Sequence, residues 1–187
     1  MPFPMFFART SVFLCLLMLC GCASIPLSTA LRLSSLDERA LVQLDPAGIR
    51  VKVAIPRGNT LNPEATRLTL KLQPEGQAAR VAAMPLRLIG STQGERSPGV
   101  LSRNIAVTTY ELALTAEGAS QLRNLQREVL NSRGDRGKVE LSVNTSFSEF
   151  VPGTREMIFW VDVKLRADDA YLTLFDGAKV SFKMAES

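Results

Sequence analysis

Side chains alternate between apolar and polar over much of the chain after residue 48, and this two-residue period constrains the fold most strongly. The run from Ile49 to Ile55 has an apolar residue at every odd position, and the run from Leu68 to Leu72 has leucine at every even one. Successive side chains of a strand point to opposite faces, so this alternation is typical of half-buried strands. The pattern predicts a chain built mainly of β-strands.

Further segments show the same pattern or are bounded by turn residues, and we expect strands at about 79–89, 105–115, 138–147, 157–165, 171–175 and 178–184. Pro85 cannot donate to a β-ladder, which favours an edge position or a bulge within its strand. The polar segment Ser91–Gly99 is expected to be a loop. Asp176-Gly177, between the last two segments, is typical of a hairpin turn.

Two segments have a helical period instead. Ser35 and Glu38 have the spacing of a capping box, and the apolar residues that follow predict a short helix at about 36–44. Thr115 has the properties of an N-cap, and an apolar stripe predicts an amphipathic helix at about 116–131. About eight strands with local turns favour an antiparallel β-sandwich, with a partly open β-barrel as the alternative.

The composition limits the chemistry that the chain can perform. It contains no histidine, and its three cysteines are Cys15, Cys20 and Cys22. A folded domain after Cys22 therefore has no disulfide, no Ser–His or Cys–His pair and no His or Cys ligands for zinc. We expect no cofactor and no enzymatic activity. Ser146, Ser148 and the Thr108-Thr109 pair have no histidine to serve as a base.

The first 22 residues have the parts of an export signal. Arg9 precedes an apolar run from Val12 to Leu19, which is shorter than the roughly 20 residues that span a bilayer. Leu19-Cys20-Gly21-Cys22 follows, with leucine three residues before Cys22 and the small Gly21 directly before it. This segment resembles the lipobox of bacterial lipoproteins.

The resemblance implies that cleavage occurs between Gly21 and Cys22 and that Cys22 carries a thioether-linked diacylglycerol and an N-linked acyl chain such as palmitate. Cys15 and Cys20 each follow a leucine, which is too large for the position before the cleavage site. The expected parts are a signal peptide (1–21), the lipidated cysteine with a tether (22–34) and one periplasm-facing β-rich domain (35–187). Ala23, rather than aspartate, after the cysteine implies the outer membrane rather than the inner membrane.

The charge of the exported chain is only mildly basic. Residues 1–21 contain one arginine and no acidic residue, so their removal lowers the formal net charge from +4 to +3. So small an excess argues against a dedicated polyanion binder, and export argues against nucleic acid as a partner. One basic cluster is a candidate contact for lipid head groups or for a protein partner: Arg123, Arg127, Arg133, Arg136 and Lys138. The simpler interpretation is a basic helix C-terminus.

Two other groups are candidate sites. Asp162 interrupts an apolar strand, and Asp168, Asp169 and Asp176 follow it, as paired carboxylates for Ca²⁺ or acid–base chemistry would, but turns and a solvated face are the favoured explanation. Four aromatic residues fit either a pocket or the core: Phe147, Phe150, Phe159 and Trp160.

The sequence as a whole predicts a membrane-anchored lipoprotein that serves as a non-catalytic binding or assembly component of the bacterial cell envelope. Its expected partners are the membrane, through the lipid, and an envelope protein. A carrier or sensor of an apolar ligand is the alternative and would need an enclosed apolar cavity. A carboxylate-based envelope hydrolase is less favoured and would need two carboxylates in one cleft.

Overall fold

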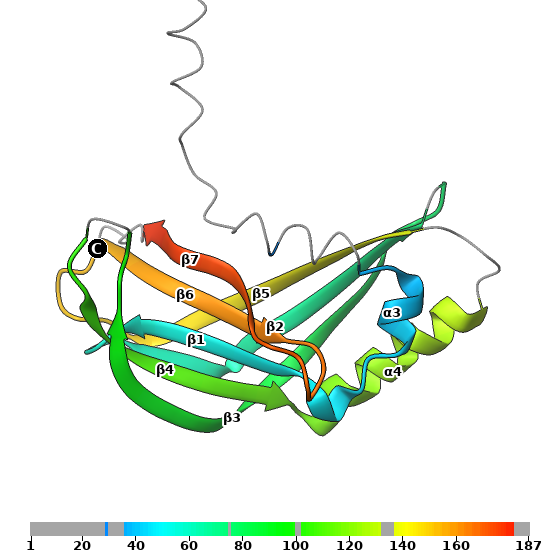
Figure 1. The fold of residues 1–187 in the computed structure, drawn as a ribbon, viewed down its shortest axis with the longest axis horizontal. Coiled ribbons are helices and arrows are strands. Elements are labelled where there is room, and N and C mark those ends of the chain that lie inside the picture. The colour runs from blue at the N-terminus through cyan, green and yellow to red at the C-terminus, as the bar shows by residue number, and fades with distance from the viewer. Residues whose placement is uncertain (1–28, 30–35, 75, 100–101, 132–136, 182–187) are drawn as a thin grey trace, which may run out of the picture.

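The computed structural model of the chain describes residues 29, 36–74, 76–99, 102–131 and 137–181 (Figure 1). The signal peptide, Cys22 and all of the tether except Thr29 lie outside the described residues. From residue 36 onward the described chain forms these elements: α3 (Glu38–Val42), a 3-10 turn η1 (Pro46–Gly48), β1 (Arg50–Pro56), β2 (Thr60–Pro74), β3 (Arg80–Arg96), β4 (Ile105–Leu114), α4 (Ala116–Asn131), β5 (Gly137–Glu149), β6 (Glu156–Lys164) and β7 (Leu172–Ser181).

The seven strands form one antiparallel sheet in the order β5-β2-β3-β4-β1-β6-β7. The mostly β, antiparallel fold expected from the sequence is confirmed. Of the two predicted architectures, the structure matches the alternative, a curled and partly open barrel. β3 makes the curl, because its first part pairs with β2 and the remainder, from Leu86 to Arg96, pairs with β4. In Figure 1, β2 and β5 consequently run obliquely to β1, β4 and β6.

One apolar core fills the inside of the curl. Val51, Val53, Val161 and Val163, on two adjacent central strands, are fully buried, as the alternation predicts. Three leucines of β2 and two of α4 belong to the same cluster: Leu68, Leu70, Leu72, Leu122 and Leu125. The curled sheet and the helix therefore share a single core.

Both helices begin at side-chain caps. Thr115 caps α4, since its Oγ1 accepts from the N–H of Gly118 at 3.0 Å. Asp37 rather than Ser35 caps α3, since its Oδ1 accepts from the N–H of Ala40 at 2.8 Å. The helix expected at 36–44 is therefore shorter, whereas α4 has the predicted bounds.

Of the helices formed by the described residues, none has the length and apolar character needed to cross a bilayer.

Two local expectations were wrong. Most of the expected loop Ser91–Gly99 is strand, because β3 continues through Arg96 by pairing with β4. Asp176-Gly177 is not a hairpin turn but a bulge inside β7. Phe159 pairs with Ala178 and Val161 pairs with Phe175, so two residues lie opposite one residue of β6, and Gly177 has a φ of +70°. The strand count is accordingly seven.

Gly118 marks how tightly α4 packs on β3, and Gly118→Ala is expected to destabilise the protein by about 1–3 kcal/mol. A Cβ at this position would lie 2.6 Å from the carbonyl oxygen of Pro85 and 3.4 Å from the Cβ of Met84. Urea denaturation measures the loss. Gly94→Ala is the matched control, since a Cβ there meets nothing within 4 Å. Equal midpoints for the two variants would contradict this packing.

Candidate functional site: a cleft between strands β2 and β3

The sheet opens between β2 and β3. The last pair of the β2–β3 ladder joins Arg67 to Pro85, and within the described residues β3 pairs beyond that point with β4 alone. Pro85 has no N–H, and its carbonyl oxygen accepts from the N–H of Thr115 at 3.0 Å, on the edge away from β2. The expected edge position or bulge at Pro85 is wrong, because β3 lies between β2 and β4 and its bulge follows Leu88; Pro85 lies where β3 changes its partner.

A wide bulge moves β2 away from β3 at the same place. In the pairing of β2 with β5, Asn62 lies opposite Ser146 and Arg67 opposite Asn144, so four residues of β2 face one of β5. The bulge satisfies its own polar groups. Asn62 Oδ1 accepts from the N–H of Ala65 at 3.2 Å, and the buried Thr66 donates to the carbonyl of Asn62 at 2.8 Å. These hydrogen bonds fix the opening without a ligand.

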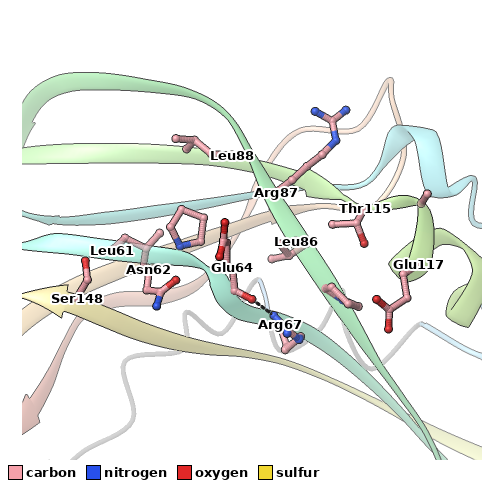
Figure 2. A pocket seen from close by; sticks show the side chains of 13 residues that line it. Leu61, Asn62, Glu64, Arg67, Leu86, Arg87, Leu88, Thr115, Glu117 and Ser148 are labelled. Atoms are coloured by element: carbon pink, nitrogen blue, oxygen red, sulfur yellow. Dashed lines mark hydrogen bonds between the residues drawn. The ribbon is translucent and has the colours of Figure 1, made fainter.

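The opening is a cleft of about 890 Å³ (Figure 2). Its apolar floor includes Leu61 and Leu86, both buried, and Leu88, which is 44% exposed. Polar and charged side chains from β2, β3, β5 and α4 form the rim: Asn62, Glu64, Arg67, Arg87, Thr115, Glu117 and Ser148. Arg67 is held in place by hydrogen bonds to the carbonyls of Glu64 and Thr66.

The wall formed by β3 presents an open strand edge. The carbonyl of Pro85 points toward β4 and α4, as its bond to Thr115 shows. Backbone groups of successive strand residues point to alternate edges, so those of the exposed Leu88 point away from β4 and toward the cleft, whereas Leu86 is buried. Exposed donors and acceptors in an extended strand are a template for a further strand. The cleft therefore offers both main-chain hydrogen bonds and an apolar surface.

Glu64 and Glu117 are the two carboxylates of the cleft. Glu64 belongs to β2 and Glu117 to the first turn of α4, and Figure 2 shows them on different walls. Both residues are exposed.

The aspartates considered as a possible site do not lie together. Asp162 is buried on the outer face of the sheet, where it accepts from Arg96 Nη2 at 2.6 Å and from Thr173 Oγ1 at 2.7 Å. Asp168 and Asp169 are exposed after β6, and Asp176 belongs to the β7 bulge. In the described part of the chain, no three acidic, histidine or cysteine residues lie close enough to hold a metal ion.

A second polar group on the outer face contains Tyr171. Tyr171 donates to Glu111 Oε1 at 2.7 Å, and Lys52 Nζ lies 4.1 Å from the centre of its ring. Burial raises the pKa of Tyr171 well above its ordinary value, and the hydrogen bond to Glu111 raises it further. Tyr171 thus remains a neutral donor to Glu111 of β4.

Removing Arg96 should cost stability because it leaves Asp162 buried without its cation. Arg96→Met is expected to lower the free energy of unfolding by about 2 kcal/mol. The double variant Arg96→Met/Asp162→Leu should recover part of the loss, since no buried charge then remains unpaired. Thermal denaturation of the three proteins tests this. A double variant less stable than Arg96→Met would contradict a structural role for the pair.

The aromatic residues serve packing on both faces of the sheet. Phe147 and Phe159 pack against the main core, and Phe159 stacks on Phe175 with ring centres 5.6 Å apart. Trp160 is buried on the opposite face with Ala54 and Val107. Phe150, which is exposed, contacts Phe147. None of these residues lines the cleft.

The basic cluster is described only in part. Arg123 and Arg127 are exposed on α4, and Lys138 is exposed at the start of β5. Arg133 and Arg136 lie outside the described residues, as do Gly21 and Cys22. The assignment of this cluster to head groups or to a partner stays a prediction.

Sequence reasoning missed the cleft. Its lining comes from β2, β3, β5, α4 and Thr115, and no motif connects them. Pro63 and Pro85 were the available signal, since each removes a backbone donor from the two strands that separate. Comparisons of the chain with protein-family models, with curated proteins and with solved structures find no match.

Proposed function

We propose that the protein is a bacterial lipoprotein, anchored at the outer membrane through Cys22, whose periplasm-facing domain is a non-catalytic binding component of the cell envelope. The lipobox-like Leu19-Cys20-Gly21-Cys22 supports the anchor. The cleft supports the binding role. We further propose that the cleft takes an extended peptide segment of an envelope protein as an added strand on β3.

The open edge of β3 is the observation that carries this proposal. An extended peptide satisfies the backbone groups of Leu88, and one of its apolar side chains can cover the exposed Leu88 side chain. The outermost strands of the sheet, β5 and β7, also have an edge that pairs with no other described strand. The edge of β3 differs from them because it borders a cleft with apolar and charged walls, which can select a sequence.

The polar backbone groups and the charged rim of the cleft favour a peptide over an apolar molecule. An acyl chain has no polar groups and would bury the donors and acceptors of β3 without partners, which costs free energy for each group. Glu64, Arg87 and Glu117 also leave the rim of the cleft charged and exposed. A carrier of an apolar molecule would need an enclosed apolar cavity, whereas this cleft has exposed charged residues on its rim.

A matched pair of variants tests the peptide site. Peptides selected from a displayed random library on the purified mature protein should bind Leu88→Glu at least about tenfold more weakly, since the change places a charge on the apolar floor. Ile89→Glu is the control, because Ile89 is 42% exposed on the same strand but does not line the cleft. Equal affinity for the two variants, measured by calorimetry, would refute the proposed site.

A further inference from the structure

The exposed surface of α4 has two sides of different character. Its buried residues face the core: Gly118, Leu122, Leu125 and Val129. At 100° per residue, Arg123, Arg127 and Leu130 lie within about 60° of one another on one side of the helix. The two acidic residues, Glu117 and Glu128, lie on the other side. The helix therefore separates its basic residues from its acidic ones.

Contacts of α4 identify what each side borders. Gln126 Nε2 donates to the carbonyls of Leu41, Val42 and Leu44 at 3.1, 3.2 and 2.8 Å, so the basic side adjoins α3. Glu128 lines a small hollow together with Val81 of β3, so the acidic side adjoins the sheet. The basic side thus continues onto α3.

Exposed apolar and cationic groups meet where α3 and α4 adjoin. Leu130 is 67% exposed, and it lines a shallow groove of about 370 Å³ with Val42 and Arg39. Glu38 is the carboxylate of this groove and is half-buried. We call the surface formed by Arg39, Val42, Arg123, Arg127 and Leu130 the α3–α4 face. An exposed leucine among arginines is typical of surfaces that lie in the head-group region of a bilayer.

The chain enters the domain beside this face. α3 begins at Glu38, shortly after the expected tether, and it is only five residues long. Ala23–Ser34 would span at most about 40 Å from the lipidated cysteine, even when fully extended. The α3–α4 face therefore contains the first helix after the proposed attachment point.

We infer that the α3–α4 face docks on anionic phospholipid head groups of the membrane that holds the anchor. The inference rests on the proposed lipid on Cys22, and it deepens that proposal by giving the domain an orientation. Arg39, Arg123 and Arg127 contact the phosphates, and Leu130 enters the apolar boundary. The domain then lies with α3 and α4 toward the bilayer.

Quenching by brominated lipid measures this docking. Full-length protein is processed in cells, and the mature Asn131→Cys variant is labelled with a polarity-sensitive fluorophore and reconstituted in vesicles that contain phosphatidylglycerol. The thioether leaves Cys22 without a thiol, so the label is unique. We expect brominated lipid to quench this label severalfold more than a label at Ile89→Cys, on β3. Equal quenching at the two positions would overturn the inference.

Charge variants test whether the arginines contribute to docking. Arg123→Gln/Arg127→Gln should lower the docked-to-undocked ratio by about 25-fold, about fivefold for each arginine, and vesicles of phosphatidylcholine alone should lower it at least as much. The control Arg103→Gln/Arg155→Gln removes two exposed arginines elsewhere and should change nothing. No effect of the first pair would also overturn docking.

Mass spectrometry of Cys22 distinguishes failure of the proposed function from failure of the inference. An unacylated Cys22 would refute both together, whereas acylated protein without docking refutes the inference alone.

Discussion

Val51→Asp is expected to leave the protein unfolded at room temperature. Val51 is fully buried in the central strand β1, between Leu112 of β4 and Val163 of β6. An unpaired carboxylate at this place costs several kcal/mol, a large share of the 5–15 kcal/mol by which domains are usually stable. Circular dichroism with thermal denaturation measures the loss.

Ile89→Asp is the control for this variant, because the same change at an exposed position of β3 should have a small effect. Val143→Asp should fall between the two, since Val143 is only partly buried against the core. If Val51→Asp melted at the temperature of the unaltered protein, the assignment of the inner face of the sheet would be wrong.

Cys22→Ala is expected to abolish acyl labelling and to leave residues 1–21 attached. The proposed thioether would be formed by the Cys22 sulfur, so both acylation and processing should be lost in this variant. Metabolic labelling with a radioactive or alkyne-bearing palmitate measures the first, and a shift in gel mobility measures the second.

Cys20→Ala is the control for processing, because Leu19 before Cys20 is too large for the cleavage site. This variant should be labelled and cleaved like the unaltered protein. Labelling that persists in Cys22→Ala, or that is lost in Cys20→Ala, would contradict the assignment of the lipid to Cys22.

Local patterns in the sequence were enough to predict most elements of the fold. Alternation identified β1 and the core-facing valines of β6, and Thr115 with its apolar stripe identified α4. These features depend on residues a few positions apart. Asp176-Gly177 shows where local reasoning fails, because the same dipeptide suits a hairpin or a bulge, and only the pairing of β7 with β6 decides between them.

The curl of the sheet and the cleft depend on distant pairing and could not be predicted in this way. β3 exchanges β2 for β4 at Pro85, a choice that involves residues far apart in the chain. The sequence showed that Pro85 weakens a ladder, but not which neighbouring strand would leave. Leu61 and Leu88 looked like ordinary strand residues, and only the separation of β2 from β3 makes them the wall and floor of a site.

Residue-resolved hydrogen exchange of the mature protein, with and without a selected peptide, tests the central claim most directly. In the free protein, the amide of Leu88 should exchange fast, whereas the amide of Arg87, directed toward β4, should exchange slowly. The bound peptide should slow exchange at Leu88 and leave Arg87 unchanged. Protection that appears instead along β5 or β7, with Leu88 still fast, would contradict a peptide-binding edge on β3.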